Sequence, residues 1–276
     1  MQASSAYTPS RGYALLPQAL DAAELAGIEA ALAELMAFAD ARLRGSDQPW
    51  PGPQEAPIVV AERSDPLKVC RVEHLVGSSP AFARLAAERL RPWAEAAAGQ
   101  PMALFKDKCN LKQPGGGAFR PHQDITAYKG FGPAFHLTVA IVLDDATVEN
   151  GCLEFAPHYL EELSTPREAG EPGRALDAYE GGPRNGDVVD ELAERLTWES
   201  TPARRGDVVL FDSYVPHRSD VNATGSTRRM FFFTFNPLAE GDHYARYYAM
   251  KRSEPDNPIF HVSTPTAHAS LAAVSE

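Results

Sequence analysis

The sequence predicts a mainly β fold with α-helices, in which two sheets form a barrel or jelly roll flanked by N-terminal helices. Helical periodicity is confined to residues 1–100, and short segments rich in Val, Phe and Thr follow from residue 102 onward. Gly, Pro, Asn and Asp separate these segments, as they do in sandwiches and barrels. Helices first and a β-rich body afterwards favour a barrel with helices packed on its outside.

The N-terminal segment is expected to consist of a frayed end, a short strand and a helix. Residues 1–12 are small and polar, which is typical of a frayed terminus. A strand over 13–16 leads into a helix, and Asp21 with Glu24 marks the start of this helix as a variant of the capping box. The buried stripe of the helix is expected to consist of Leu25, Ile28, Leu32 and Leu35.

A second helix is expected over residues 80–99. Ser79 would cap its start, and Gly99 marks its C-terminal end. A Pro-rich loop over 48–57 separates it from the first helix.

The β-rich body contains five segments with strand character. They are MALFKDKCNLKQ (102–113), FHLTVAIVLDD (135–145), GCLEFAP (151–157), GDVVLFDSY (206–214) and RRMFFFTFNPL (228–238). Residues 161–199 connect the third and fourth segments and hold eleven acidic and four basic residues. A connection of this length in a compact domain is typically functional or disordered. We interpret it as a lid inserted into a single domain of residues 1–276, with a plain solvated loop as the alternative.

Composition excludes several classes of protein. The net charge of −11 and the absence of a long Lys/Arg run argue against a nucleic-acid partner. The three cysteines are odd in number and widely spaced, which argues against a disulfide framework and a thiolate zinc site. The sequence has neither a signal-peptide pattern nor an apolar stretch of membrane-spanning length, so we expect a cytoplasmic protein with no membrane partner. The oligomeric state is left open.

Two histidines and one aspartate form a candidate metal site. His122 and Asp124 in PHQD are two residues apart, so on an extended backbone both side chains point to the same face. This pair alone is weak evidence, and it needs a third ligand. His217, after the apolar run GDVVLFDSYVP, supplies one. Two His and one carboxylate leave open positions on the metal, which is the arrangement of non-haem Fe(II) oxygenases.

Arg228 is a candidate for binding a carboxylate near the metal site. It follows His217 by eleven residues, across an expected turn over 222–225, and a hairpin there would place it on a strand antiparallel to the one that ends in His217. Arg holds a carboxylate through two parallel charged hydrogen bonds, and Ser219 could add a hydroxyl. A ferrous site beside such an Arg suits 2-oxoglutarate, which binds the metal through its keto acid at one end and the Arg at the other.

Four stretches of the sequence carry a resemblance to a known family. PHQD, ENGCLEFAP and HRSDVNATGSTRR, together with the opening GYALLPQALDAAEL, resemble the signatures of the phytanoyl-CoA dioxygenase-like (PhyH) superfamily. The resemblance spans almost the whole chain. It implies a double-stranded β-helix, a jelly-roll or cupin-like core, that uses Fe(II), 2-oxoglutarate and O2.

The resemblance also implies roles for single positions. Ala140 stands where the family often has an aromatic residue, so Thr138, two residues earlier on the same face, is expected to supply a hydroxyl instead. Related halogenases replace the carboxylate ligand by a small residue, so Asp124 favours hydroxylation over halogenation. The implied iron ligands are His122, Asp124 and His217, and the implied 2-oxoglutarate contacts are Arg228, Ser219, Lys108 and Thr138.

We therefore expect an oxygenase that hydroxylates an unactivated C–H bond of a small molecule and releases succinate and CO2. The acidic 161–199 segment favours a polar or cationic substrate, and a specialised metabolite would suit the composition. Desaturation, epoxidation, ring closure and alcohol oxidation are alternatives with the same cofactors. A non-catalytic cupin-like metal-binding or sensor protein is the alternative of another class.

Overall fold

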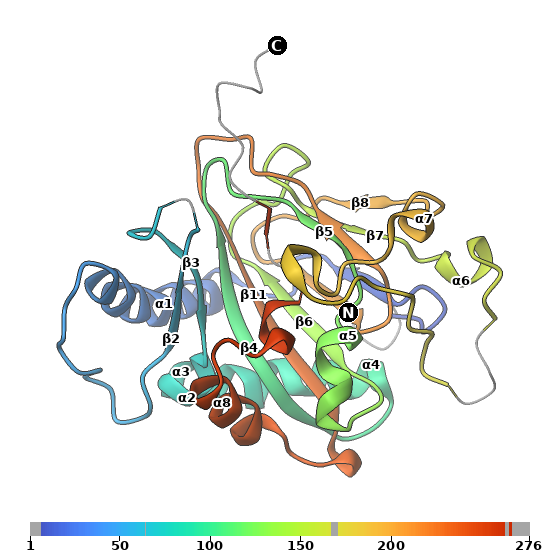
Figure 1. Cartoon of the computed structure of the whole chain (residues 1–276). Helices are drawn as coiled ribbons and strands as arrows, with labels where there is room; N and C mark the ends of the chain where they lie inside the picture. The colour runs from blue at the N-terminus through green and yellow to red at the C-terminus, as the bar shows by residue number, and fades with distance from the viewer. Residues whose placement is uncertain (1–6, 64, 167–170, 263–264, 267–276) are drawn as a thin grey trace.

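Two antiparallel sheets form the body of the protein (Figure 1). The structure is a computed structural model, and it describes residues 7–63, 65–166, 171–262 and 265–266. The larger sheet has the order β1 (Tyr13–Leu16), β9 (Val208–Asp212), β6 (Leu137–Val142), β11 (Arg228–Pro237), β4 (Met102–Lys112), β3 (Val69–Glu73) and β2 (Ile58–Ala61). The smaller has the order β5 (Phe119–His122), β10 (His217–Ser219), β7 (Leu153–Phe155) and β8 (Glu199–Thr201). The predicted mainly β core is confirmed.

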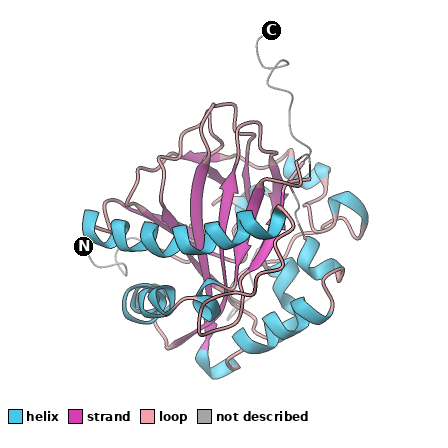
Figure 2. Cartoon of the chain, turned by 90° about the vertical axis from the view of Figure 1, so that its left-hand side faces the viewer, coloured by secondary structure: helices cyan, strands magenta, loops and turns pink. Residues whose placement is uncertain are grey.

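The first helix, α1 (Ala22–Leu43), forms as predicted. The Asp21 carboxylate accepts hydrogen bonds from the backbone N–H groups of Ala23 and Glu24, and the Glu24 carboxylate accepts one from the N–H of Asp21. The predicted stripe of Leu25, Ile28, Leu32 and Leu35 is buried. Figure 2 shows this helix lying across the strands, so its apolar stripe covers the outer face of the larger sheet.

The second predicted helix is interrupted by one wide turn. It consists of α3 (Pro80–Leu85), the π-helical turn η2 (Ala86–Leu90) and α4 (Arg91–Ala98), and Gly99 ends it with a φ of 67°. Pro92 explains the wide turn, because proline has no N–H for the carbonyl four residues earlier and its ring presses on that carbonyl. Ser79 makes no capping hydrogen bond through its side chain.

The remaining helical elements are short, except for one. They are α2 (Leu75–Ser78), α5 (Ile125–Tyr128), η3 (Lys129–Phe131), α6 (Tyr159–Glu162), η4 (Gly182–Arg184), α7 (Asp190–Ala193), η5 (Leu238–Glu240), α8 (Tyr244–Ser253) and η6 (Pro258–His261). Within the described residues, no helix is both long and apolar enough to cross a membrane.

Strand β4 separates the helical layer from the interior of the barrel. Its outward residues Cys109 and Leu111 are buried in the same apolar cluster as the stripe of α1. Asp107, also outward and fully buried, accepts hydrogen bonds from the backbone N–H groups of Leu75 (2.5 Å) and Val76 (3.2 Å) and from the hydroxyl of Tyr244 (2.8 Å). Burial raises the pKa of Asp107 to about 6. Helices α2 and α8 are thereby tied to the back of this strand.

The expectation of a frayed end over residues 1–12 is wrong for Tyr7 to Gly12. Tyr7 is buried, and its hydroxyl donates to the Asp212 carboxylate at 2.9 Å. Backbone hydrogen bonds from Arg11 and Gly12 to the carbonyl of Thr8 close the turn that follows. Residues 1–6 of that expectation lie outside the described residues.

The expected hairpin between His217 and Arg228 does not form. Strand β10 pairs with β5 and β7 in the smaller sheet, whereas β11 pairs with β4 and β6 in the larger one. Where the chain crosses between the sheets, the amide of the buried Asn222 donates to the carbonyls of Lys112 and Ser226. Arg228 therefore lies in the sheet opposite His217.

Replacement of Leu35 by alanine tests the packing of α1 on the sheet. Leu35 is fully buried, so Leu35→Ala is expected to lower the free energy of unfolding by about 2–5 kcal/mol. Urea denaturation followed by circular dichroism measures it. Leu67 is 53% exposed, and the control Leu67→Ala should change the same quantity by less than about 0.5 kcal/mol. Equal losses in the two variants would contradict this packing.

Candidate functional site

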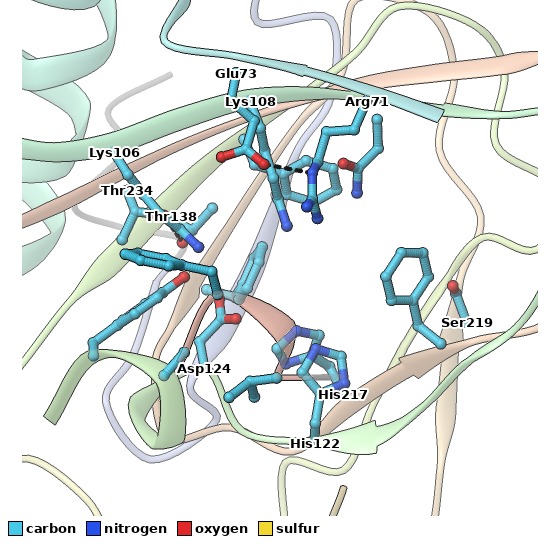
Figure 3. Close-up of a pocket in the computed structure, with 18 of the residues that line it drawn as sticks. Arg71, Glu73, Lys106, Lys108, His122, Asp124, Thr138, His217, Ser219 and Thr234 are labelled. Atoms are coloured by element: carbon cyan, nitrogen blue, oxygen red, sulfur yellow. Dashed lines mark hydrogen bonds and ion pairs between the residues drawn. The ribbon is translucent and has the colours of Figure 1, made fainter. Parts of the chain in front are cut away.

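His122, Asp124 and His217 converge inside the barrel. His122 ends β5 and His217 begins β10, and the two are direct cross-strand partners with ring centroids 4.1 Å apart. Asp124 has helical dihedrals (φ −60°, ψ −29°), so the extended geometry expected for this pair is wrong for its second member. One possible ligand atom from each residue lies within 4.8 Å of the others. Figure 3 shows the three side chains turned toward one another.

Hydrogen bonds fix the orientation of both imidazole rings. Nδ1 of His122 donates to the carbonyl of Arg120 at 2.7 Å, and Nδ1 of His217 donates to the carbonyl of Val215 at 3.1 Å. A carbonyl can only accept, so the proton lies on Nδ1 in each ring and Nε2 keeps its lone pair. Metal-binding histidines are commonly oriented in this way.

The local charges prepare the three side chains for a cation. Burial, and then the neighbouring His217, lowers the pKa of His122 to about 3. Burial also lowers the pKa of His217. Burial opposes ionisation of Asp124, but the imidazole of His217 and the ammonium groups of Lys106 and Lys108 together lower its pKa. At neutral pH the site therefore offers two neutral imidazoles and one carboxylate, the protonation states that a metal requires.

A row of polar side chains points from β4 into the pocket beside this triad. The pocket is lined by Lys106, Lys108 and Asn110, which alternate with outward apolar or anchored residues. Of these three, only Lys108 was predicted from the sequence. The alternation in KDKCNLK was the available signal, since every second residue of a strand faces the same side. Burial lowers the pKa of Lys108 to about 7, and Lys106 and Arg71 act in the same direction.

Glu73 is a carboxylate on the neighbouring strand β3, and it is paired with two cationic side chains of the pocket. Its carboxylate lies 2.6 Å from Nε of Arg71 and accepts hydrogen bonds from Nζ of Lys251 at 2.8 and 2.6 Å. Burial opposes ionisation of Glu73, but the charges of Arg71 and Lys251 lower its pKa to about 2. None of these three residues was predicted, because they meet only through the pairing of β3 with β4 and the packing of α8.

A second cationic group lies at the other end of β4. Arg228 is 3% exposed, and its Nε has no hydrogen-bond partner among the described residues. Burial lowers the pKa of Arg228 to about 10. Its cross-strand partner Lys112 donates from Nζ to Oγ of Ser219 at 2.8 Å and to the carbonyl of Asp220. Ser219 therefore already has a cationic partner, while the Arg228 guanidinium has an unused donor.

Of the other positions considered for the site, Thr138 lines the pocket, whereas Ala140 and Arg229 are not among its lining residues. Thr138 lines it, with Oγ1 2.9 Å from Oγ1 of Thr234. Ala140 is fully buried in the apolar cluster between the sheets. Arg229, next to Arg228 on β11, forms an ion pair with Asp144 at 2.7 Å.

The 161–199 segment, of which residues 167–170 lie outside the described residues, contacts the end of β5 and the residue that follows it. Gln123, between His122 and Asp124, is 1% exposed. Its amide donates to the carbonyl of Arg174 at 3.0 Å and accepts from the N–H of Leu176 at 2.7 Å. The N–H of Val188 donates to the carbonyl of Pro121. The segment is thus docked beside the candidate metal site, and its role as a lid stays a prediction.

His136 lies behind the site. It is fully buried, its ring packs against Phe105 and Tyr128, and neither ring nitrogen has a hydrogen-bond partner among the described residues. Burial lowers the pKa of His136 to about 3.

Comparison of the sequence with known proteins finds a matching family and similar enzymes. A model of the family described as phytanoyl-CoA dioxygenase (PhyH) matches residues 10–230. A methylphosphonate hydroxylase from Gimesia maris is 33% identical over 243 residues, which cover 87% of this chain and 82% of that protein. A 2-aminoethylphosphonate dioxygenase from an uncultured bacterium is 34% identical over 187 residues, which cover 67% of this chain and 66% of that protein.

Solved structures share the fold. EctD from S. alaskensis with 2-oxoglutarate and 5-hydroxyectoine has a TM-score of 0.63 at 22% identity, and the match covers 97% of this chain and 84% of that chain. The epimerase SnoN in complex with Fe3+, alpha ketoglutarate and nogalamycin RO has a TM-score of 0.57 at 23% identity, over 85% of this chain and 82% of that chain. These likenesses confirm the predicted jelly-roll core.

His136 gives the protein a testable pH dependence. Its folded pKa of about 3 lies below the ordinary value of 6.5, so the unfolded chain binds the proton first and stability falls as the pH drops below about 6.5. This loss approaches about 1.4 kcal/mol per pH unit for one such histidine. His136→Leu should lose about 1 kcal/mol less than wild type between pH 6 and pH 5 in urea denaturation. An unchanged difference would show that His136 does not stay neutral.

Proposed function

The chain belongs to the phytanoyl-CoA dioxygenase family, and we propose that it is an Fe(II)- and 2-oxoglutarate-dependent oxygenase that hydroxylates a C–H bond of a small organophosphonate. The observation that carries this proposal is the triad of His122, Asp124 and His217, whose two histidines are buried. Two imidazoles and one carboxylate within 4.8 Å of one another are the donor set of non-haem iron oxygenases.

The residues present fit the ferrous ion. Nε2 of His122 and Nε2 of His217 carry the free lone pairs, because both Nδ1 atoms donate to backbone carbonyls. Asp124 is the anionic ligand, and its presence favours hydroxylation over halogenation. The rings of Phe155 and Phe211 pack on His217 with centroids 6.0 and 5.0 Å away, and they keep water from that side of the site.

The residues present also fit 2-oxoglutarate. Arg228 is a buried guanidinium with an unused N–H, and it suits the distal carboxylate of the cosubstrate. Ser219 and Lys112 stand beside it and share a hydrogen bond. Thr138 also lines the pocket, where its cross-strand partner is Thr234, and we retain its hydroxyl as a contact of the cosubstrate. Lys108 was expected to bind the cosubstrate, and we assign it to the substrate instead, because it pairs with Phe232, four residues from Arg228.

The proposed reaction consumes one O2 and one 2-oxoglutarate for each molecule of substrate. When bound, the iron and the cosubstrate supply the oxidation that places one oxygen atom in the C–H bond and the other in succinate, with loss of CO2. The contribution of the chain is to hold the target carbon beside the metal and to exclude water.

The charge of the pocket supports an anionic substrate. The relatives are named for methylphosphonate and 2-aminoethylphosphonate, which both carry a phosphonate group. Lys106 and Lys108 face the pocket beside the triad. The acidic 161–199 segment suggested a polar or cationic substrate; the pocket lining favours the opposite charge, because the charges that contact a substrate are those inside the pocket.

Other outcomes of the same chemistry are separated by product analysis. Desaturation, ring closure and alcohol oxidation each remove two hydrogen atoms and would give a product lighter than the hydroxylated phosphonate. Epoxidation adds one oxygen atom, as hydroxylation does, and its product would be distinguished by NMR. The non-catalytic alternative is disfavoured, since the family and the relatives are named for dioxygenase and hydroxylase activities.

Succinate formation tests the proposed function directly. Protein loaded with Fe(II) and 2-oxoglutarate and exposed to O2 is expected to form succinate and hydroxymethylphosphonate from methylphosphonate in equal amounts, measured by mass spectrometry. His122→Ala should lower both by more than about 100-fold, because a ligand is lost. His158 is exposed, and His158→Ala should retain both products. Wild type that forms no succinate with any phosphonate would contradict the proposal.

Replacement of Arg228 tests the cosubstrate assignment. Arg228→Met removes a charged hydrogen-bond donor and should raise the KM for 2-oxoglutarate at least about tenfold, with the Fe(II) requirement within about twofold of wild type. Arg229→Met, on the opposite face of the same strand, should leave the KM unchanged. Equal effects of Arg228→Met on both requirements would count against its assigned role.

A further inference from the structure

The interior of the barrel contains two separate cationic groups. One consists of Lys106 and Lys108, and the other of Arg228 and Lys112. We propose that Lys106 and Lys108 form the subsite for the phosphonate group of the substrate, and that this subsite selects phosphonates without an ammonium group. The inference rests on the proposed function, because it assigns the Arg228 group to the cosubstrate and the two lysines to the substrate.

Strand β4 sets the distance between the two groups. Lys106 pairs with Thr234 and Lys112 pairs with Arg228, so the two ends of the row are six residues apart on β4. At about 3.3 Å per residue their backbones are about 20 Å apart. Figure 3 agrees: Lys106, Lys108 and Arg71 lie on one side of the pocket, and Ser219 lies beyond the two histidines. One small diacid cannot occupy both groups while it also binds the metal.

Lys106 and Lys108 have no anion of their own. Neither ammonium group has a hydrogen-bond acceptor or a carboxylate at ion-pair distance among the residues that the structure describes. Their neighbours are ring faces: Nζ of Lys106 lies 4.4 Å from the ring centroid of Tyr128, and Nζ of Lys108 lies 5.2 Å from that of Phe232. Aromatic faces attract a cation but do not replace its hydrogen bonds. Two adjacent, desolvated ammonium groups are unfavourable until an anion binds between them.

The position of the lysines suits a very short substrate. Lys106 and Lys108 line the same pocket as Asp124 (Figure 3). In methylphosphonate the reacting carbon is bonded directly to phosphorus. Its anionic oxygens must therefore lie next to the metal. Arg71, Arg218 and Lys251 also line this pocket but are paired with carboxylates, whereas Lys106 and Lys108 have no such partner among the described residues. A tetrahedral group with three oxygens can accept hydrogen bonds from both lysines at once.

The same pocket has no free carboxylate for an ammonium group. In the described part of the chain, Glu73 and Asp124 are the carboxylates that line it. Glu73 is held by Arg71 and Lys251, and Asp124 belongs to the triad. The amide of Asn110 also lines the pocket but carries no charge. The amino group of 2-aminoethylphosphonate would therefore meet uncompensated cations, and like charges in a dry pocket repel strongly.

Calorimetry on the anaerobic protein loaded with Fe(II) and 2-oxoglutarate tests the subsite without turnover. Methylphosphonate and inorganic phosphate are expected to bind, and the neutral ester dimethyl methylphosphonate is not. Lys106→Met and Lys108→Met should each weaken methylphosphonate binding at least about tenfold and leave the Kd of 2-oxoglutarate within about twofold. Arg228→Met should do the reverse, and the exposed control Lys68→Met should change neither.

Selectivity is tested on wild type alone, which keeps the inference falsifiable if a lysine variant fails to fold. 2-Aminoethylphosphonate is expected to bind at least about tenfold more weakly than methylphosphonate, and equal affinities would overturn the exclusion of ammonium groups. Lys106→Arg and Lys108→Arg retain the charge and should retain binding. Methylphosphonate affinity unchanged in both methionine variants, or a loss of 2-oxoglutarate affinity in them, would overturn the subsite.

The two proposals can fail separately. If wild type binds methylphosphonate through the lysines but forms no succinate, the oxygenase function is wrong and the anion subsite stands. If wild type forms succinate from a substrate whose binding is unaffected by Lys106→Met and Lys108→Met, the function stands and the subsite is wrong.

Discussion

The pairing of β5 with β10 is the constraint on which the rest of the site depends. It places His122 directly opposite His217, although the two residues are far apart in the sequence. This pairing requires the chain to leave the larger sheet after β9 and enter the smaller one within a few residues. Asp212 holds that crossing, because its carboxylate accepts hydrogen bonds from the backbone N–H groups of Tyr214 and Val215 and from the hydroxyl of Tyr7. A chain that continued straight through β9 would leave His217 on the wrong sheet.

The inner face of β4 imposes a second constraint, and it is electrostatic. Lys106, Lys108 and Lys112 point into a space that also holds Arg228, and burial lowers the pKa of each of the four. Charges of one sign in a desolvated space destabilise the empty protein. The large apolar cluster between the sheet and the helices supplies the stability that offsets this charge repulsion. The anionic ligands proposed for this site would relieve the repulsion when they bind.

Much of the fold follows from local sequence. The bounds of β1, the capping box of α1 and the buried stripe beneath it are properties of neighbouring residues, and they were predicted correctly. Strands β2 and β3 were missed, because short edge segments owe their structure to pairing with distant strands rather than to their own periodicity. The π-helical turn before Pro92 was missed because sequence pattern places a proline in a helix but does not say how the backbone adapts.

The site was predictable where its residues are close in sequence or carry distinctive chemistry. His122 and Asp124 are two residues apart, and arginine is the side chain best suited to hold a carboxylate, which is why Arg228 could be singled out as a candidate. The group around Glu73 was not predictable, because its partner Lys251 is 178 residues away and reaches it from a helix. The crossing at Asn222 was misjudged as a hairpin, because a turn sequence fixes the reversal of the chain but not the sheet that the next strand joins.

The alternation of β4 has an evolutionary consequence. Its outward residues hold the helices, with Asp107 tied to α2 and α8, whereas its inward residues Lys106 and Lys108 contact the pocket. Substitutions at the inward positions can therefore change which molecule is recognised while the scaffold is inherited unaltered. Relatives with one architecture and different substrates are the natural outcome of such a strand, since selection can act on its two faces independently.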